Sequence, residues 1–470
     1  MTTTDQPQDL LTTFVAQARW FGGKGRDFSI TGGRRLGEVP GHVADGPHVA
    51  IDLVTLSFED GGADEYYQLP LAFYAEPQER IAHAHLGQWH DEDFGTCHVY
   101  DAVHDREAMA CWLRSFADPP ESGPLAFHRL PGHELDLETH STLFAGEQSN
   151  SSVAFGDDSL MKVFRKITPG ANPDISIHEV LTTAGSDHVA ALYGWLDTPS
   201  LTTEGEPTDQ VLQLAMLQQF LKTATDGWDL ALASVRNLFA EADLHADEVG
   251  GDFAGESARL GEALAEVHAS LAHHFPTEER SAAQVGALAA AMRDRLEAAL
   301  LVVPGLAPHA DRLRAAYDDL AALESVRVQR IHGDLHLGQT LRTVRGWKIV
   351  DFEGEPAKPL SERVLPDSPW RDVAGMLRSF DYAPRVVERT WGNTDDDNAP
   401  QRAYRAAEWA ERNRTTFLEA YAGRELTADE HVLLAAYVAD KAVYETVYEV
   451  RNRPSWVAIP LEAVARIGVS

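Results

Sequence analysis

The chain has 470 residues, more than a single hydrophobic core usually serves, so the sequence predicts two or three lobes. Its 40 Lys and Arg residues stand against 73 Asp and Glu residues, and the formal net charge of −33 disfavours nucleic acid and anionic membrane surfaces as partners. The two cysteines are too few for a disulfide framework, and neither a signal peptide nor an apolar run of membrane-spanning length stands out, so we expect a cytoplasmic protein.

The first part of the chain is predicted to hold a β-rich piece and a connector. Residues 28–75 alternate apolar and polar side chains around the turn-forming EDGGAD, which is typical of half-buried strands. Residues 76–137 carry helical patches such as DREAMACWLRSFA, followed by a passage rich in Pro and Gly. We therefore expect an N-terminal domain over residues 1–90 and an intermediate connector over residues 91–137.

Short β-prone runs come next, and long helices follow them. STLFAG, SSVAFGD and SLMKVFRK are separated by small polar residues, as strands of hairpins are. After DGWD, apolar residues recur at helical spacing, as in ESARLGEALAEVHASLAHHF. These patterns predict a small β-rich lobe over residues 138–222 and a mainly helical lobe over residues 223–470, and the fold class is α+β.

One strand–loop–strand element, IHGDLHLGQTLRTVRGWKIVDFEGEP, interrupts the helical lobe and is crowded with polar residues. It places Asp334 and Asp351 at or just beyond strand ends, so we expect two carboxylates on one rim. Phosphoryl transfer needs one carboxylate that orients or deprotonates the attacking hydroxyl, and oxygen ligands that hold Mg²⁺ against nucleotide phosphates. Asp334 suits the first role, and Gln339 and Asp351 suit the second.

A zinc site is the alternative interpretation of this stretch, because His332 and His336 stand at an i, i+4 spacing. The sequence lacks the glutamate of an H-E-x-x-H pair, and the flanking runs are β-prone, so the zinc interpretation is the weaker one. FGGKGR at residues 21–26 lacks the spacing of a phosphate-binding G-x-x-x-x-G-K-[ST] loop, and we interpret it as a structural turn.

The lobe over residues 138–222 offers groups for nucleotide phosphates. A turn of small polar residues presents backbone N–H groups to phosphate oxygens. Lys162 lies in a β-like run, the place from which a lysine reaches the α- and β-phosphates in kinase folds, and Glu179 is the acid predicted to orient it. A plain hairpin turn, a solvent-facing lysine and a surface glutamate are the alternatives. The predicted turn consists of Ser149, Asn150, Ser151 and Ser152.

The segment HGDLHLGQ…DFEGEP…RDVAGMLRSFDYA resembles the catalytic part of aminoglycoside-phosphotransferase-like kinases, and more narrowly of bacterial maltokinases. EQSNSSVAFGDDSLMKVFRKITPGANPD and DKAVYETVYEVRNRPSWVAIPL are also similar to maltokinase segments, and ARWFGGKGR is similar to part of that family's cap domain. The resemblance covers nearly the whole chain. It implies a bilobal protein-kinase-like fold, in which a cap at residues 1–90 is fused to a nucleotide-binding N-lobe and the helical C-lobe carries the catalytic loop and the sugar site.

The same resemblance implies phosphorylation of maltose by ATP, with Mg²⁺, to maltose 1-phosphate for α-glucan (glycogen) synthesis. By position, Asp334 is then the catalytic base, Lys162 the phosphate clamp, and Gln339 and Asp351 the Mg²⁺ ligands, with Glu353 assisting at the metal. Glucosamine or another hexose derivative is the alternative substrate. A catalytically inactive kinase-like binding module is a weaker alternative, because the whole set of functional residues is intact. A small-molecule sugar is the expected partner, and the oligomeric state is left open.

Sugar recognition is expected from the C-terminal helical part. Tyr444 and Tyr448 stand at i, i+4 with acids beside them, a combination that suits stacking on a sugar ring and hydrogen bonds with its hydroxyls. A helix packing face with solvated acids is the alternative. An amino sugar needs extra acids, which Asp440, Glu445 and Glu449 can supply. The expected sugar-contacting residues are His336, Asp372, Arg378, Asp440, Lys441, Tyr444, Glu445, Tyr448 and Glu449.

Overall fold

The computed structural model describes residues 7–144, 149–201, 207–241, 243–356, 358–391 and 398–466. The chain divides into two compact units. Unit 1 comprises Met1–Glu179 and Ala190–Lys222, and unit 2 comprises Val180–Val189 and Thr223–Ser470. The chain therefore passes into unit 2 for Val180–Val189, returns to unit 1 at Ala190, and passes into unit 2 again after Lys222.

Unit 1 begins with a six-stranded antiparallel sheet of order β1-β2-β3-β5-β4, with β10 paired to β3. The strands are β1 (Phe28–Glu38), β2 (His48–Phe58), β3 (Glu65–Tyr74), β4 (His85–Asp91), β5 (Gly95–Asp101) and β10 (Lys166–Ile167). Helix α1 (Pro7–Gln17) packs against β4 and β1. The alternation over residues 28–75 thus predicted strands correctly. The sheet continues past residue 90, because β4 and β5 form a hairpin in which Asp91 pairs with Gly95.

The FGGKGR segment is a structural turn, as the sequence predicted. Phe21 is buried, and a side chain at Gly23 would collide with the rings of Phe21 and Phe58. Gly25 has φ +81°, a backbone conformation that favours glycine. The guanidinium of Arg26 lies over the Phe58 ring at 3.6 Å, so this basic residue packs on the sheet.

The second sheet of unit 1 has the order β6-β11-β12-β9-β8-β7. Its strands are β6 (Ala126–Arg129), β7 (Ser141–Leu143), β8 (Asn150–Phe155), β9 (Ser159–Phe164), β11 (Leu192–Leu201) and β12 (Pro207–Gln219). Buried Gln68 ties the two sheets together, since its side-chain amide donates to the carbonyls of Phe164 and Leu214. Helix α2 (Arg106–Ala117) begins at Asp105, whose carboxylate accepts the N–H of Glu107, and α3 (Pro173–Thr183) follows β10.

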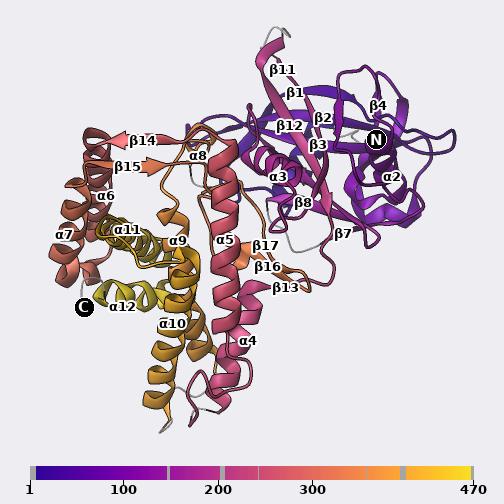
Figure 1. The fold of residues 1–470 in the computed structure, drawn as a ribbon. Coiled ribbons are helices and arrows are strands. Elements are labelled where there is room, and N and C mark those ends of the chain that lie inside the picture. The colour runs from indigo at the N-terminus through magenta and orange to yellow at the C-terminus, as the bar shows by residue number, and fades with distance from the viewer. Residues whose placement is uncertain are drawn as a thin grey trace. The chain divides into compact units, whose positions relative to one another are not determined.

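Unit 2 is mainly helical, as predicted. Its longer helices are α4 (Gly227–Ala240), α5 (Ala254–His274), α6 (Ala282–Val302), α7 (Ala310–Ala321), α9 (Trp370–Thr390), α10 (Ala399–Ala422), α11 (Ala428–Asn452) and α12 (Ala458–Arg466). Helix α5 lies along α10, and α11 packs on α9 (Figure 1). Gly261 allows the first of these contacts, because a side chain there would collide with the backbone of Phe417. The apolar stripe predicted on α5 is buried.

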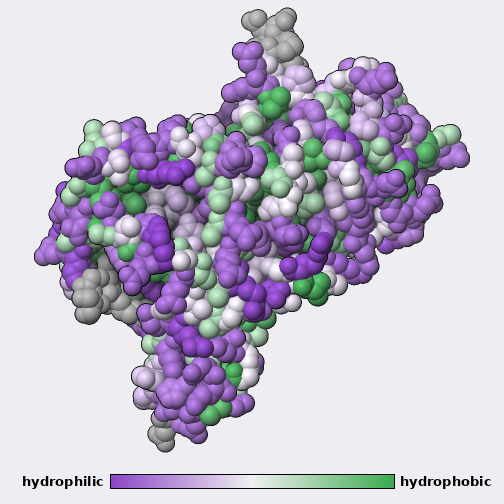
Figure 2. All heavy atoms as spheres, in the orientation of Figure 1, coloured by the Kyte–Doolittle hydropathy of each residue, from purple (hydrophilic) through white to green (hydrophobic). Residues whose placement is uncertain are grey.

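Short elements complete unit 2. The strands are β13 (Thr225–Asp226), β14 (Glu278–Ser281), β15 (Ser325–Val328), β16 (Thr340–Thr343) and β17 (Gly346–Ile349), and α8 is Leu360–Arg363. The five strands form a three-stranded sheet, β13-β16-β17, and a two-stranded sheet, β14-β15. Among the described residues, no helix is both long and apolar enough to cross a membrane. Hydrophilic residues cover most of the face drawn in Figure 2, consistent with the strongly acidic composition.

Candidate active site

The strand–loop–strand element of unit 2 brings the two aspartate loops together, as the sequence predicted. His332 Nε2 donates to the carbonyl of Val350 at 3.0 Å, and the Val350 N–H donates to the carbonyl of Gln339 at 3.0 Å. Gly333 and Gly354 pass so closely that a side chain on Gly333 would touch the Cα of Gly354 at 3.4 Å. The loop that carries Asp334 and the loop that follows β17 therefore share one rim.

The structure does not support the zinc alternative. Both ring nitrogens of His332 form hydrogen bonds to the backbone, since Nε2 donates to Val350 and Nδ1 accepts the N–H of Asp334 at 3.3 Å. The Nδ1 atom of His336 accepts the N–H of Gly338 at 3.1 Å. The His336 Nε2 atom therefore carries the proton of the neutral ring. His336 lines the cavity described below, and burial lowers its pKa.

Asp372 on α9 holds the Asp334 loop in place. Its Oδ1 atom accepts the N–H of Gly333 at 2.8 Å, and its Oδ2 atom accepts the N–H of His332 at 2.7 Å and the Nε2–H of His268 at 3.0 Å. Burial opposes ionisation of this carboxyl, but the hydrogen bond and charge of His268 outweigh burial and lower its pKa. Asp372 was predicted at the sugar, and the structure instead places its carboxylate against the loop backbone.

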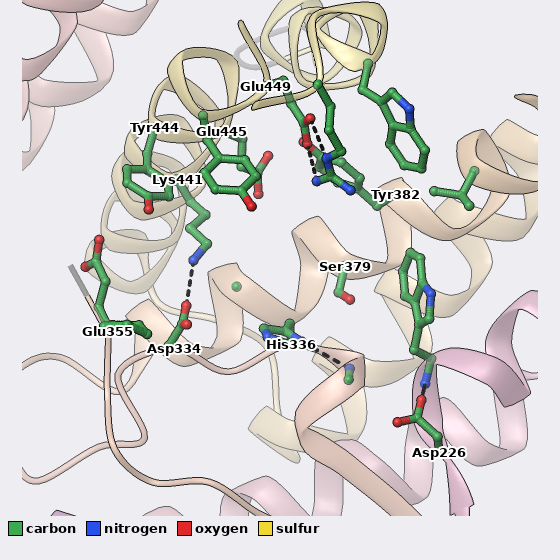
Figure 3. A pocket seen from close by; sticks show the side chains of 18 of the residues that line it. Asp226, Asp334, His336, Glu355, Ser379, Tyr382, Lys441, Tyr444, Glu445 and Glu449 are labelled. Atoms are coloured by element: carbon green, nitrogen blue, oxygen red, sulfur yellow. Dashed lines mark hydrogen bonds and ion pairs between the residues drawn. The ribbon is translucent and has the colours of Figure 1, made fainter. Parts of the chain in front are cut away.

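A cavity of about 800 Å³ lies in unit 2 beside Asp334 (Figure 3). Helix α11 contributes Tyr444, Glu445, Tyr448 and Glu449, all four of which were predicted at the sugar. Tyr444 and Tyr448 are 40% and 44% exposed, so they do not form a helix packing face. The remaining lining residues are Asp226, Trp228, Asp229, Asp334, His336, Gly338, Glu355, Pro356, Gly375, Ser379, Tyr382, Val386, Lys441, Arg453 and Trp456.

Lys441 reaches from α11 to the predicted catalytic base (Figure 3). Its Nζ atom lies 3.0 Å from Oδ1 of Asp334. Burial of the lysine opposes its charge, but the nearby carboxylates of Asp334 and Glu445 outweigh burial and raise the pKa of Lys441. Lys441 was predicted at the sugar, and the structure shows a cation that also holds the Asp334 carboxylate at the cavity wall.

Arg378 is buried and holds a residue of the cavity wall, Glu445, in place. This arginine is 1% exposed, and it donates to Glu445 Oε2 from Nη2 at 2.6 Å and from Nε at 2.9 Å. Its Nη1 atom donates to Asp381 at 2.7 Å. Burial raises the pKa of Glu445, although the charge of Arg378 opposes the shift. Arg378 was predicted to contact sugar, but it does not line the cavity and instead positions Glu445.

Asp440 takes a different place from the other predicted sugar residues. Its carboxylate accepts from Arg295 Nε at 2.9 Å and from Arg295 Nη2 at 2.8 Å. Asp440 lines a second cavity of about 160 Å³, which Asp334 and Lys441 also line. It is absent from the lining of the larger cavity, so the prediction that Asp440 meets the sugar there is not supported.

The residues predicted to hold Mg²⁺ lie together in unit 2. Gln339 Nε2 donates to Oδ2 of Asp351 at 2.9 Å, and carboxylate oxygens of Asp351 and Glu353 lie within 4.8 Å of each other. Asp351 has φ +66°, the only positive φ outside glycine in the described residues. Such backbone conformations persist where the surrounding structure holds them, often at functional sites. Two carboxylates and an amide oxygen are hard oxygen donors of the kind Mg²⁺ prefers, so the set fits this ion.

In unit 1, Lys162 is buried and its Nζ atom lies 3.0 Å from Oδ2 of Asp174 on α3. Burial opposes ionisation of Asp174, but the charges of Lys162 and His178 outweigh burial and lower its pKa. Asp174 therefore holds the position against Lys162 that was predicted for Glu179. Asp174 is the second residue of α3 and Glu179 the seventh, so the two acids lie more than one turn apart on the helix.

The small polar residues predicted as a phosphate-binding turn lie mostly in a strand. Ser149 precedes β8, and Asn150, Ser151 and Ser152 are its first residues, with Ser152 paired to Lys162. Backbone groups of these strand residues take part in sheet pairing, which explains why they do not form the predicted turn. The connection between β7 and β8, residues 145–148, lies outside the described residues.

Sequence reasoning missed part of the cavity wall. Asp226, Trp228 and Asp229 come from the DGWD segment at the start of α4, where no site residue was predicted. Arg453 and Trp456 come from RNRPSW, and Arg453 donates to both oxygens of Glu449. Two tryptophans beside charged residues were an available signal, because aromatic and polar groups together are typical of small-molecule sites.

Comparison with known proteins places these features in a family. The maltokinase N-terminal cap domain model matches residues 14–105, and the phosphotransferase enzyme family model matches residues 248–414. A glucosamine kinase from Streptacidiphilus jiangxiensis is 34% identical over 329 residues, which cover 67% of this chain and 70% of the relative. A glucosamine kinase from Mycolicibacterium smegmatis is 27% identical over 326 residues, which cover 67% of this chain and 76% of the relative.

Solved structures agree with the sequence comparison at the level of the fold. A glucosamine kinase in complex with glucosamine, ADP and inorganic phosphate is similar at a TM-score of 0.67 and 24% identity, over 99% of this chain and 100% of that chain. A second crystal form of a glucosamine kinase gives a TM-score of 0.66 and 25% identity, over 96% and 98%. The chain therefore belongs to the aminoglycoside-phosphotransferase-like sugar kinases that carry a maltokinase-type N-terminal cap, a family that includes glucosamine kinases, and it is a phosphotransferase that acts on a sugar hydroxyl.

Proposed function

We propose that this protein is an ATP- and Mg²⁺-dependent kinase that phosphorylates glucosamine. The observation that supports the proposal most is the cavity of about 800 Å³ in unit 2, where Asp334 stands among acidic and aromatic side chains of α4, α9 and α11. Cavities of this size and mixed lining are typical of small-molecule sites. The relatives that are 34% and 27% identical are named glucosamine kinases, which favours an amino sugar over a neutral one.

The distribution of charge in the cavity supports an orientation for the amino sugar. The ammonium of Lys441 lies against Asp334 and repels a second cation from that wall. Figure 3 shows Asp226 well separated from Asp334, and Asp229 also lines the cavity from α4. Burial and the charge of Asp229 raise the pKa of Asp226, so a cation bound beside this pair would be stabilised. We therefore place the ammonium near α4 and the reacting hydroxyl at Asp334.

The aromatic wall suits the body of a sugar. The rings of Tyr444 and Tyr448 have centroids 6.5 Å apart and planes 24° apart, and both side chains are partly exposed. Such a nearly parallel pair presents one apolar face, against which the C–H groups of a hexose ring pack. Glu445 and Glu449 lie beside the tyrosines and offer carboxylate oxygens to sugar hydroxyls, while Arg378 and Arg453 hold those carboxylates in place.

In the proposed reaction, Asp334 orients the sugar hydroxyl and accepts its proton while the sugar oxygen bonds to the γ-phosphorus of ATP. The bond between that phosphorus and the bridging oxygen breaks, and ADP leaves. Lys162, held by Asp174, binds the α- and β-phosphates. Asp351, Glu353 and Gln339 hold Mg²⁺, which neutralises charge on the phosphates when bound.

Maltose is the second candidate substrate. The maltokinase-type cap at residues 14–105 favours it, as does the volume of the cavity, which has room for a disaccharide. Under this alternative the product is maltose 1-phosphate, a precursor of α-glucan. The two candidates differ in the ammonium group that only glucosamine carries and in the second glucose unit that only maltose carries.

A substrate panel tests the proposal. ADP release by the purified protein is measured with glucosamine, N-acetylglucosamine, glucose and maltose, each with ATP and Mg²⁺. We expect kcat/KM to be at least about tenfold higher for glucosamine than for the other sugars, a difference of about 1.4 kcal/mol that one buried charge contact can supply. A higher value for maltose would transfer the assignment to the second candidate, and no turnover of any sugar would refute the kinase proposal.

The Asp229→Asn variant tests the proposed position of the ammonium. It removes one negative charge from the α4 side of the cavity, so we expect KM for glucosamine to rise while kcat/KM for glucose stays unchanged. Asp243→Asn is a matched control on a loop outside the cavity lining, and it should change neither value. An equal loss for both sugars in Asp229→Asn would contradict the proposed orientation.

A further inference from the structure

Glu355 lies in the loop after β17 and takes no part in the reaction proposed above. It lines the cavity of about 800 Å³ beside Asp334, and it also lines the second cavity of about 160 Å³. Gly354 before it has φ +72°, a backbone conformation that favours glycine, and Pro356 after it disfavours a helical backbone at Glu355. The GEP sequence therefore narrows the backbone conformations with which this loop presents Glu355 to the two cavities.

Arg371 at the start of α9 holds one oxygen of this carboxylate. Its Nη2 atom donates to Glu355 Oε2 at 2.9 Å, and its Nη1 atom donates to Asp367 at 3.1 Å. Asp367 in turn accepts from Arg280 at 2.9 Å and from the hydroxyl of Tyr437 at 2.8 Å. This network of hydrogen bonds fixes Arg371, and through it the Glu355 side chain, at the cavity wall.

The other oxygen of the Glu355 carboxylate is open to a ligand. Lys358 Nζ lies 3.4 Å from Oε2, the same atom that Arg371 binds, and Oε1 accepts no hydrogen bond within the described part of the chain. The Glu355 side chain is 18% exposed, and Oε1 is not one of the buried polar atoms that lack a partner. Oε1 is therefore an accessible acceptor on a side chain whose position is fixed.

Glu355 stands beside the aromatic wall on which the sugar ring is proposed to pack. Figure 3 shows its carboxylate pointing toward Tyr444, at the same end of the cavity as Lys441 and Asp334. Burial raises the pKa of Tyr444, and the negative charge of Glu355 adds to this rise, as expected for close neighbours. A hexose that packs on Tyr444 with one hydroxyl at Asp334 would thus present another hydroxyl to Glu355.

We propose that Glu355 is a specificity-determining residue that accepts, through Oε1, a hydrogen bond from a second hydroxyl of the sugar. The inference rests on the proposed kinase function, and it holds for glucosamine and for maltose because both sugars carry several ring hydroxyls. A hydrogen bond to a fixed carboxylate is strong and directional, so it helps to decide which hydroxyl reaches Asp334. A sugar that lacks the second hydroxyl cannot form this bond, and the enzyme discriminates against it.

Sugars that lack single hydroxyls test the inference. The value of kcat/KM is measured in wild type and in Glu355→Gln, for the sugar that wild type prefers and for the monodeoxy analogues of that sugar. For the parent sugar we expect Glu355→Gln to lower kcat/KM about tenfold or more, because the hydroxyl loses a hydrogen bond to a charged group. For the analogue that lacks the second hydroxyl, wild type should lose a similar factor, and Glu355→Gln should lower kcat/KM less than about threefold further.

The remaining outcomes distinguish this inference from the proposed function. An equal loss for the parent sugar and for every analogue would overturn the inference, because it would show that Glu355 only pairs with Arg371. An unchanged kcat/KM in Glu355→Gln would also overturn it. Both results leave the kinase proposal standing, whereas no turnover of any sugar by wild type refutes the kinase proposal and this inference with it.

Two further variants complete the experiment. Glu355→Asp keeps a negative charge for Arg371 but shortens the side chain by one methylene, so it replaces Glu355→Gln if that variant fails to fold. It should show the same dependence on the second hydroxyl, and an equal loss for all analogues would overturn the inference here too. Glu362→Gln makes the matched chemical change at an exposed position of α8 outside the lining of both cavities, and it should keep the wild-type kcat/KM for every sugar.

Discussion

Lys441 holds the carboxylate of Asp334 at the cavity wall, with 3.0 Å between the two charged atoms. Replacing it with methionine keeps most of the buried stem but frees the carboxylate to rotate. We expect kcat of Lys441→Met to fall about 10- to 100-fold, because small displacements of a catalytic group cost this much, while the affinity for ADP stays unchanged. Steady-state kinetics and calorimetric titration with ADP measure both. An unchanged kcat would show that Asp334 does not need this contact.

Arg378 compensates Glu445, and its loss leaves a carboxylate whose side chain is only 13% exposed without its main partner. We expect Arg378→Met to lower the free energy of unfolding by about 3 kcal/mol at pH 7. Arg385 on the same helix pairs with Glu388 in a more exposed place, and Arg385→Met should cost at most about 1 kcal/mol. Urea denaturation of both variants measures the difference, and equal losses would contradict the buried-pair account.

The stability lost in Arg378→Met should depend on pH. Burial already raises the pKa of Glu445 above its ordinary value, and removing Arg378 takes away the charge that opposes this rise. A folded-state pKa above the unfolded value means that the folded variant binds the proton more tightly, so its stability falls as pH rises above about 4.5. The deficit relative to wild type should therefore be largest near pH 7 and shrink toward pH 4.5. A deficit that grows as pH falls would contradict this assignment.

At the scale of elements, Asp372 couples helix α9 to the catalytic loop through the N–H groups of His332 and Gly333. Asparagine has the same size but presents one N–H₂ group where these donors need an acceptor. We expect Asp372→Asn to lower stability by about 1–3 kcal/mol and to lower kcat more than KM, because the loop that carries Asp334 loses its anchor. Glu388→Gln, at a partly exposed position of α9 away from the loop, is the control. A normal kcat in a folded Asp372→Asn protein would refute the positioning role.

Helix α11 carries much of the cavity wall and begins with a capping box. Thr427 Oγ1 accepts the N–H of Glu430, and Glu430 accepts the N–H of Thr427 at 2.9 Å. The hydrogen bond from Arg424 lowers the pKa of Glu430 to about 2. Glu430→Gln removes the charge from this helix start, and we expect it to lower the free energy of unfolding by about 1 kcal/mol at pH 7.

The pH dependence of this cap has a definite sign. A carboxyl whose folded pKa is depressed stabilises the protein above its unfolded pKa, and the contribution is lost as pH falls toward about 2. The difference between wild type and Glu430→Gln should therefore be full at pH 7 and clearly smaller at pH 2.5, as measured by denaturation at both values. A constant difference across this range would show that the charge of Glu430 contributes nothing.

At the scale of the molecule, the sequence predicted what depends on short-range spacing. The rim shared by Asp334 and Asp351 follows from strands that end a few residues away, and the buried stripe of α5 follows from its helical period. The positions of Asp372 at the loop backbone and of Arg378 against Glu445 did not follow from the sequence, because helical periodicity does not say which side of a buried helix faces a ligand. Asp226 reaches the cavity from more than one hundred residues before Asp334, and only tertiary packing brings the two together.

The domain boundaries also show that short-range sequence patterns do not report long-range contacts. The hairpin of β4 and β5 extends the first sheet beyond residue 90, since pairing between strands is a long-range contact that local turn signals do not reveal. The change to helices after Lys222 was predicted, because it is a change of period within the sequence itself. The substrate belongs to the least predictable level, since one ammonium distinguishes glucosamine from neutral hexoses and a few side chains in the cavity decide between them.

The rate at which ATP-dependent phosphorylation of glucosamine proceeds in Asp334→Asn tests the central claim most directly. Asparagine preserves the size of the side chain and can still accept a hydrogen bond, but it cannot take the hydroxyl proton. We predict that kcat falls by about a thousandfold or more while the affinity for ADP is unchanged. A rate within about tenfold of the wild-type rate would contradict the assignment of Asp334 as the catalytic base and of the cavity beside it as the sugar site.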